Sequence, residues 1–122
     1  MKLNPALFLA SLWIVTIVPA FSHHAEPLYD LKNPTTVSGV VTRVEWSNPH
    51  AYLYVNVKSD KGEVEEWSIE LTSPNSLKRN GWTNNAVKVG DQVACTGGRA
   101  KTGARTMRAI TIERAGGKKL KG

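Results

Sequence analysis

The sequence predicts an all-β domain that carries one short helix. Apolar and polar residues alternate with period two in segments 37–46, 50–58 and 64–71, as in half-buried strands. Residues that favour helix caps follow at 73–81, and two further apolar segments come after them. The order strand, strand, strand, helix, strand, strand is that of the OB-fold, a five-stranded barrel (β-β-β-α-β-β). The rival interpretation is another small β-barrel or sandwich.

The first predicted strand runs from Val37 to Trp46. Its alternation places Arg43 and Glu45 on the solvent face. Gly39 would permit a bend or a bulge, and the pair Asn48–Pro49 ends the strand. The residues expected to face inward are Val40, Thr42, Val44 and Trp46.

A hairpin is expected to join the second and third strands. The second strand runs from about His50 to Lys58, and the third runs from Val64 to Leu71. The intervening Ser59-Asp60-Lys61-Gly62 has the composition of a turn. The expected inward residues are Leu53, Val55, Val57, Trp67, Ile69 and Leu71, and the expected outward residues are Tyr52, Tyr54, Asn56, Glu66, Ser68 and Glu70.

A helix of about two turns is predicted after the third strand. Ser73 suits the N-cap, Pro74 suits the first helical position, and Gly81 suits a left-handed stop. Core packing is expected for the tryptophans Trp46, Trp67 and Trp82.

Two strands are predicted after the helix. The fourth opens within Val87–Val93 and ends or kinks at Gly97–Gly98. The fifth runs from Met107 to Arg114, with Ile110 and Ile112 inward. Cys95 is in phase with Val93, so we expect a buried thiol.

Residues 1–22 have the pattern of a cleaved signal peptide. Lys2 precedes the apolar run Ala6–Val18, and small residues stand at Ala20 and Ser22, so cleavage is expected after Ser22. The apolar run is shorter than the ~20 residues that span a bilayer, so only the signal peptide is expected to contact the membrane. With a single cysteine and no internal disulfide, the mature chain is predicted to be a bacterial periplasmic protein held by its core.

The mature chain divides into an N-terminal arm at 23–36, an OB-like barrel domain at 37–114 and a basic tail at 115–122. From residue 99 onward, eight basic residues stand against the single acidic Glu113. We expect the tail to be a frayed and solvated terminus. The alternative is a polyanion-binding segment for anionic lipid headgroups or cell-wall polymers, and no nucleic acid is expected outside the cytoplasm.

An ordered set of motifs runs through the mature chain: His23-His24, Val44–His50, Trp67–Leu71, Ser73–Asn75, Leu77, Arg79, Gly81-Trp82 and Val89–Val93. This set resembles one family of small exported bacterial proteins, those that share domain of unknown function 6152. The resemblance covers nearly the whole mature chain, and it implies an exported small β domain with no established activity. The sequence differs from the family where Ala25–Asp30 follows the paired histidines.

The histidines are the first candidate site. Cleavage after Ser22 would give His23 a free α-amine beside two imidazoles, and His50 could add a further nitrogen. Copper(II) favours such nitrogen ligands, so copper at His23, His24 and His50 is the favoured hypothesis. Zinc is the alternative metal, with a carboxylate of Glu26, Asp30 or Glu70 completing the site. The competing interpretation is a disordered terminus, with His50 capping a turn.

The second candidate site is the outer face of the barrel. Tyr52 and Tyr54 share the face on which OB barrels stack ligands, which predicts a glycan, polyanion or partner protein. Glu70, Asn75 and Arg79 are low-ranked members of this face, and a local network that pins strand to helix also explains them.

A metal-dependent enzyme ranks third, because the sequence contains no recognisable acid–base pair or nucleophile arrangement. The sequence therefore favours a periplasmic binding module without catalytic activity.

Overall fold

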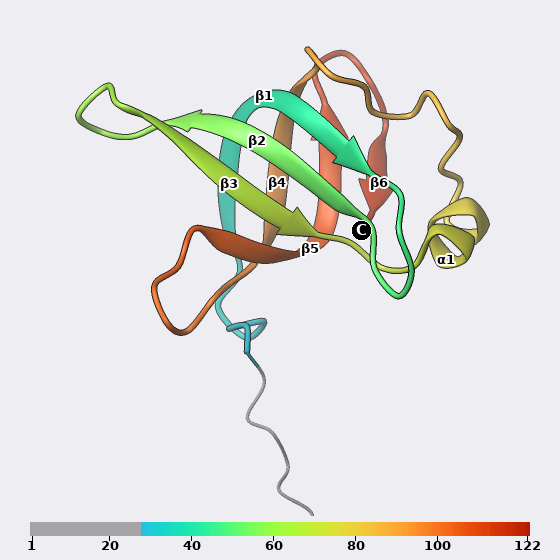
Figure 1. The fold of residues 1–122 in the computed structure, drawn as a ribbon, viewed down its shortest axis with the longest axis horizontal. Coiled ribbons are helices and arrows are strands. Elements are labelled where there is room, and N and C mark those ends of the chain that lie inside the picture. The colour runs from blue at the N-terminus through green and yellow to red at the C-terminus, as the bar shows by residue number, and fades with distance from the viewer. Residues whose placement is uncertain (1–27) are drawn as a thin grey trace, which may run out of the picture.

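The computed structural model describes residues 28–122, which form a β-barrel with one short helix (Figure 1). The strands pair in the order β3-β2-β1-β4-β5-β6, and a parallel pairing of β3 with β5 closes the barrel. The predicted OB-like order is confirmed, with the helix between the third and fourth strands. The elements are β1 (Thr35–Glu45), β2 (Tyr52–Lys58), β3 (Val64–Glu70), α1 (Pro74–Arg79), β4 (Gln92–Arg99), β5 (Thr106–Arg114) and β6 (Lys119–Lys121).

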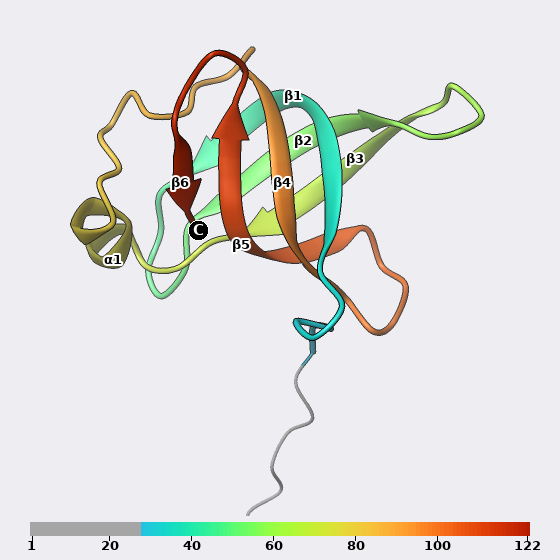
Figure 2. The ribbon, with the colours of Figure 1, turned by 180° about the vertical axis from the view of Figure 1, so that it is seen from behind.

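β1 is a long strand that pairs with β4 along its first half, Thr35–Val40, and with β2 along its second half, Gly39–Glu45. Figure 2 shows β1 curving between these two neighbours. Gly39 makes this close approach possible, because a Cβ there would lie 1.9 Å from the carbonyl oxygen of Asn56.

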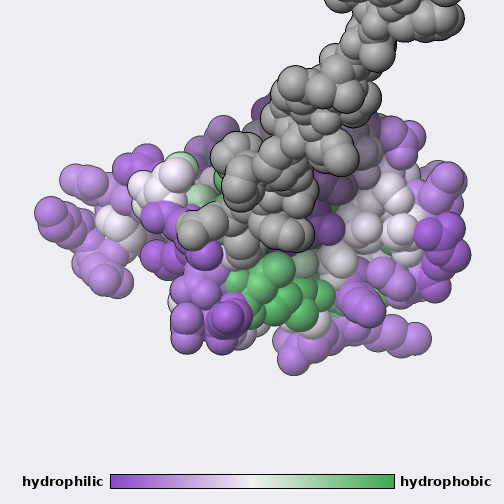
Figure 3. All heavy atoms as spheres, turned by 90° about the horizontal axis from the view of Figure 1, so that it is seen from below, coloured by the Kyte–Doolittle hydropathy of each residue, from purple (hydrophilic) through white to green (hydrophobic). Residues whose placement is uncertain are grey.

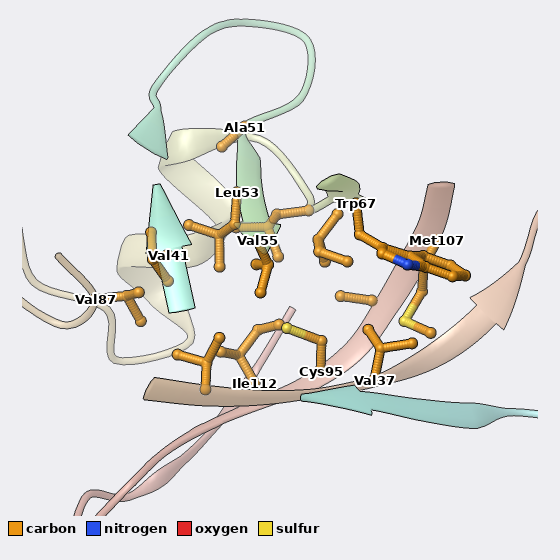
Figure 4. Packing of buried hydrophobic residues seen from close by; sticks show 14 of the residues in the cluster. Val37, Val41, Ala51, Leu53, Val55, Trp67, Val87, Cys95, Met107 and Ile112 are labelled. Atoms are coloured by element: carbon orange, nitrogen blue, oxygen red, sulfur yellow. The ribbon is translucent and has the colours of Figure 1, made fainter. Parts of the chain in front are cut away.

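The inside of the barrel is apolar. Among residues 28–122, no polar or charged side chain is buried. Figure 4 shows Leu53 and Val55 directed toward Cys95 and Ile112 across the barrel, with Trp67 beside Met107. The core consists of Val37, Val41, Ala51, Leu53, Val55, Trp67, Ile69, Leu71, Leu77, Trp82, Val87, Val93, Cys95, Met107, Ala109 and Ile112.

Cys95 is buried, as its phase with Val93 predicted. Burial raises the pKa of its thiol from 9.0 to about 12, because the apolar core disfavours the thiolate. The thiol is therefore protonated and unreactive at neutral pH.

The predicted inward face of β1 was wrong in its first half and for Trp46. Val37 and Val41 are the buried residues, and Val40 is 41% exposed. A register shift between Val41 and Arg43 inserts one residue, so the phase that leads to Val44 cannot be extended back to Val40. Trp46 lies beyond the end of β1, is 40% exposed, and meets the ring of Trp82 edge to face at 6.1 Å.

β4 and β5 also differ from the predicted pattern. Val87–Asp91 was expected to open β4 but forms a turn, in which the amide of Lys88 donates to the Asp91 carboxylate at 2.8 Å. The pairing of β4 with β5 shifts register between Thr96 and Gly97, with the extra residue on β5, and β4 continues past Gly97 to Arg99. The expectation that Ile110 points inward was wrong. Ile110 has no partner on β4 at that shift and is 40% exposed.

The helix α1 begins and ends where its capping residues predicted. Ser73 Oγ accepts a hydrogen bond from the amide of Ser76 at 3.3 Å, and Pro74 stands in the first turn. Gly81 has a φ of +92°, the left-handed conformation that ends a helix at low cost only with glycine. Leu77 is the buried residue of the helix, so α1 joins the barrel core through this side chain.

The end of the chain forms a strand, whereas its charge pattern predicted a frayed tail. Lys119–Lys121 form β6, which pairs with Thr111–Glu113 of β5. Leu120 packs against the core, and the carbonyl of Lys121 accepts the indole N–H of Trp82 at 2.8 Å. The basic side chains are thus displayed from an ordered edge strand.

The surface seen in Figure 3 is mostly hydrophilic, with one small hydrophobic area bordered by hydrophilic residues. The large hydrophobic residues that are exposed are Leu28, Leu31, Val40, Trp46, Val64, Val89 and Ile110. In the stretch from residue 28 to residue 122, the helix is too short and too polar to cross a bilayer.

Candidate functional site

Strand pairing brings four side chains into one row on the outer face of the barrel. Glu45 of β1 pairs with Tyr52 of β2, Tyr52 pairs with Glu70 of β3, and Glu70 pairs with Arg108 of β5. Residues directly opposite on neighbouring strands point to the same face of a sheet, so their side chains are neighbours. Glu70 is the last residue of β3, so the row lies at the end of that strand, next to the loop that contains His50.

Glu70 is the acceptor at the centre of this site. Its Oε2 accepts the hydroxyl of Tyr29 at 2.6 Å. Its Oε1 lies 2.7 Å from Nη1 of Arg108 and 2.7 Å from Nδ1 of His50. The side chain of Glu70 is only 12% exposed, so these contacts replace most of its hydration. We call Tyr29, His50, Glu70 and Arg108 the Glu70 cluster.

The loop before β2 is tied down at both of its ends. The hydroxyl of Ser47 donates to the carbonyl of His50 at 3.0 Å. Ala51 exchanges backbone hydrogen bonds with the end of β3, donating to Thr72 at 3.1 Å and accepting from Leu71 at 2.8 Å. Asn48–Pro49 is a cis peptide. These contacts hold the His50 imidazole beside Glu70.

The described part of the N-terminal arm lies against β4. The amide of Asp30 donates to Arg99 at 2.9 Å, and that of Lys101 donates to Leu28 at 3.0 Å. The arm comes so close that a Cβ on Gly98 would lie 2.7 Å from the backbone of Asp30. This seat places the phenol of Tyr29 against Glu70.

Both tyrosines next to Glu70 have raised pKa values. For Tyr29 the larger cause is burial, and the hydrogen bond to Glu70 adds to it, since the phenol donates to a carboxylate. For Tyr52 the cause is burial first and the negative charge of Glu70 second. Both phenols are therefore protonated at neutral pH, and that of Tyr29 donates to Glu70.

The two ring nitrogens of His50 have different surroundings. One ring nitrogen, Nδ1, faces the Glu70 carboxylate, and within residues 28–122 no hydrogen bond reaches the other, Nε2. The side chain is 38% exposed. A carboxylate on the far nitrogen orients a metal-ligating imidazole and raises its basicity. His23 and His24 lie outside the described residues, and residues 28–122 contain no group of three possible metal ligands.

The predicted carboxylate ligands have other partners. Asp30 accepts hydrogen bonds from the side chain and backbone of Asn33, and the side-chain bond is the main cause of its lowered pKa. Both oxygens of Glu70 serve the Glu70 cluster, which makes Glu70 the group that orients His50. Glu26 lies outside the described residues.

The predicted ligand face is only partly brought together. The rings of Tyr52 and Tyr54 lie 6.5 Å apart with an interplanar angle of 31°. The guanidinium of Arg43 covers the Tyr54 ring at 3.7 Å, and the Tyr54 hydroxyl donates to Glu45 at 3.3 Å. One face of Tyr54 is therefore already occupied.

Asn75 and Arg79 lie on α1, and neither forms a hydrogen bond or an ion pair with Glu70. The guanidinium of Arg79 donates to the hydroxyl of Ser76 at 2.9 Å, within the helix. Glu70 is bound to Arg108 in place of Arg79, so the network pins β3 to β5 and the arm, and not to the helix.

Sequence reasoning missed Tyr29 and Arg108 as members of the site. Arg108 follows Met107 in alternation and so faces outward, but only the parallel β3–β5 pairing places it beside Glu70. Tyr29 belongs to a segment without strand periodicity, so no local pattern predicted its contact.

Similarity to known proteins extends to the fold and to one family. The sequence profile of a family of unknown function, DUF6152, matches residues 12–109. No curated protein sequence matches the chain significantly.

Two solved structures are similar in fold. One is a mutant of TiaS that lacks its ZRD, in complex with agmatine, with 17% identity and a TM-score of 0.49 over 69% of this chain. This chain spans 21% of the length of that protein. The other is the mitochondrial single-stranded DNA binding protein Rim1 of S. cerevisiae, with 9% identity and a TM-score of 0.49 over 74% of this chain and 97% of its own length.

Proposed function

We propose a function for this chain, which belongs to the family of unknown function DUF6152, from its own side chains. The chain is an exported periplasmic binding module that holds a transition metal, with copper favoured, through His50 and the histidine pair His23–His24. The observation that carries this proposal is the contact of 2.7 Å between His50 Nδ1 and Glu70, with Nε2 left for a ligand.

The Glu70 cluster supports a metal at His50 because it fixes the imidazole. A carboxylate that accepts the Nδ1 proton selects the tautomer whose Nε2 carries the lone pair. Arg108 and Tyr29 hold the same carboxylate at 2.7 and 2.6 Å, so the ring has a rigid support. The His50 side chain remains 38% exposed, which leaves the ion a path to it.

The arm supports the proposal through its length. Tyr29 donates to the carboxylate that also binds His50, so the arm is anchored at this site. His24 precedes Tyr29 by five residues, and five extended residues span at most ~18 Å. The chain connection therefore keeps His23 and His24 within reach of His50.

The ligand set suits copper. Cleavage after Ser22 gives His23 an α-amine with a pKa near ~8, which a metal deprotonates at low cost. An amine and several imidazoles form the nitrogen-rich set that copper(II) binds more tightly than the other divalent metals of its row do.

The test is calorimetry with Cu(II) on protein that begins at His23. We expect tight binding that His50→Ala weakens at least about tenfold. Glu70→Gln is expected to weaken it about tenfold as well, since it removes the support of the ligating ring. No binding by the authentic protein, or equal affinity in His50→Ala, would overturn the proposal.

A matched control separates the terminal amine from the histidines. Protein acetylated at the α-amine of His23 keeps all three imidazoles but can no longer bind a metal through that amine. We expect it to bind Cu(II) more weakly than the authentic chain. Intact mass spectrometry of the periplasmic protein reports the terminus and any retained metal together.

A second candidate ligand is an envelope glycan or polyanion on the outer face. It is favoured by the neighbouring rings of Tyr52 and Tyr54, 6.5 Å apart. Binding of this kind is indifferent to chelators, and for a polyanion it falls steeply with salt. Tyr52→Ala should remove it and leave Cu(II) binding unchanged.

A further inference from the structure

A groove of about 480 Å³ lies on the inner side of the β2–β3 hairpin, away from the Glu70 cluster. Tyr52, beside Glu70, begins β2, whereas Lys58, in the groove wall, ends it. Trp67 of β3 and Arg99 of β4 complete the part of the wall that matters here. A volume of this size accommodates a small molecule.

The indole of Trp67 is an unsatisfied donor. The side chain is 6% exposed, and its Nε1–H, which is itself closed off from solvent, has no hydrogen-bond partner among residues 28–122. Buried polar groups are almost always paired, so an unpaired one calls for an explanation. A tryptophan N–H can only donate, which means that the missing partner is an acceptor.

Arg99 lies over this indole. Its guanidinium carbon is 4.8 Å from the centre of the Trp67 ring, and its Nε donates to the hydroxyl of Thr35 at 3.1 Å. The remaining guanidinium donors form no ion pair with a carboxylate of residues 28–122. Stacking and the bond to Thr35 fix the direction in which these donors point.

The groove wall carries a net positive charge once Glu65 is counted as neutralised by Arg105, which lies outside the wall. Lys58 also has no ion-pair partner in the described part of the chain. Of the two carboxylates in the wall, Glu65 is paired with Arg105 at 3.4 Å, which leaves Asp60 against two cations. Trp67, Arg99 and Lys58 offer donors and no acceptor.

From this arrangement of donors, we infer that the groove binds a small oxyanion, a carboxylate or phosphate group, between Arg99 and Lys58. A shift of the Trp67 indole on binding brings its buried N–H to one oxygen of this group. The guanidinium suits such a group because its donors match two oxygens at once. The site is separate from the proposed metal site, since it uses neither His50 nor Glu70.

The test is NMR titration of ¹⁵N-labelled mature protein with citrate and with inorganic phosphate at constant ionic strength. The indole resonance of Trp67 should move saturably downfield as its N–H gains an acceptor. The indole of Trp82 is the internal control, because it already donates to Lys121 at 2.8 Å and should not move. The probe that saturates first identifies the group as a carboxylate or a phosphate.

Two charge variants test the location. Arg99→Gln should weaken binding about tenfold, because it removes a charge-assisted contact. Lys61→Gln removes one charge from the same hairpin without changing the groove wall, and it should weaken binding less than about twofold. A Trp67 indole that neither probe moves overturns the inference. So does a shift that Arg99→Gln and Lys61→Gln reduce equally, since that is general charge screening.

Discussion

The polar groups on the two faces of strand β3 differ in whether they have hydrogen-bond partners. On the outer face, Glu70 accepts hydrogen bonds from Tyr29 and Arg108 and contacts His50 Nδ1, all at distances of 2.6 to 2.7 Å. On the inner face, Trp67 is buried with an indole N–H that has no partner among residues 28–122. The residues are three positions apart on one strand.

The difference separates two kinds of candidate site. On the outer face, the charge of Glu70 is balanced by its neighbours, and these contacts hold the His50 ring so that its Nε2 is available to a ligand. The inner face has left donors without acceptors, which costs stability unless something binds. Mutations on the outer face are therefore expected to lower the stability of the free protein. Mutations on the inner face are expected to change stability mainly when a ligand is bound.

The largest effect should follow from removing the outer acceptor. Glu70→Ala leaves Arg108, Tyr29 and His50 without it, and we expect a loss of about 3 kcal/mol in the free energy of unfolding. Urea denaturation measures it. Glu66→Ala is the matched control, because Glu66 is exposed on the same face of β3 and should change stability by less than about 0.5 kcal/mol. Equal losses in the two variants would remove the contrast between the faces.

A smaller loss should come from lifting the arm off β4. In Gly98→Ala the new methyl group meets the backbone of Asp30 at 2.7 Å, so the arm must shift. We expect a loss of about 2 kcal/mol and faster hydrogen exchange at the Asp30 amide, which donates to Arg99. Ser38→Ala, an exposed change on the strand beside β4, should leave both unchanged. Unchanged exchange in Gly98→Ala would mean that the arm adapts to the added methyl group.

Burial of the Cys95 thiol in the core should make the free energy of unfolding depend on pH. The unfolded thiol ionises near pH 9, while the folded one keeps its proton up to about 12. Its contribution to stability is therefore complete below pH 9 and is lost as the pH rises, by up to about 1.4 kcal/mol per pH unit. The difference between the wild type and Cys95→Ala across this range measures it. Parallel stability curves would show that water reaches the inner face.

The smallest effect should come from one hydroxyl. Tyr29→Phe removes the hydrogen bond of 2.6 Å to Glu70 but keeps the ring, and we expect a loss of about 1 kcal/mol by thermal denaturation. Tyr54→Phe removes a longer bond of 3.3 Å to Glu45, whose side chain is 43% exposed, and should cost less than about 0.5 kcal/mol. A larger loss of stability in Tyr54→Phe than in Tyr29→Phe would mean that the contact to β1 stabilises the outer face more than the contact from the arm does.

Much of the fold could be predicted because its signals are local. Ser73, Pro74 and Gly81 determine the ends of α1 through bonds within the same few residues. The alternation in β2 and β3 marks Leu53 and Ile69 as buried because a regular strand turns each side chain by half a revolution.

The errors lie where regularity fails. Val40 and Ile110 were placed inward because the alternation was read across a bulge in β1 and an irregular pairing between β4 and β5. A bulge places two residues of one strand opposite one residue of its partner, so the sequence of one strand alone does not reveal it. Likewise, the pairing of β6 with β5 overrides the charge of the last residues.

By itself, the sequence determined the order of the strands, the ends of the helix, and the choice of His50 and Glu70 as polar groups of interest. These depend on neighbours a few positions apart. Only the tertiary structure decided that Glu70 joins His50 to Tyr29 and Arg108, and that Trp67 lies under Arg99 without an acceptor. The partners of Glu70 stand 20 to 41 residues from it along the chain, and barrel closure, not local preference, brings such distant groups together.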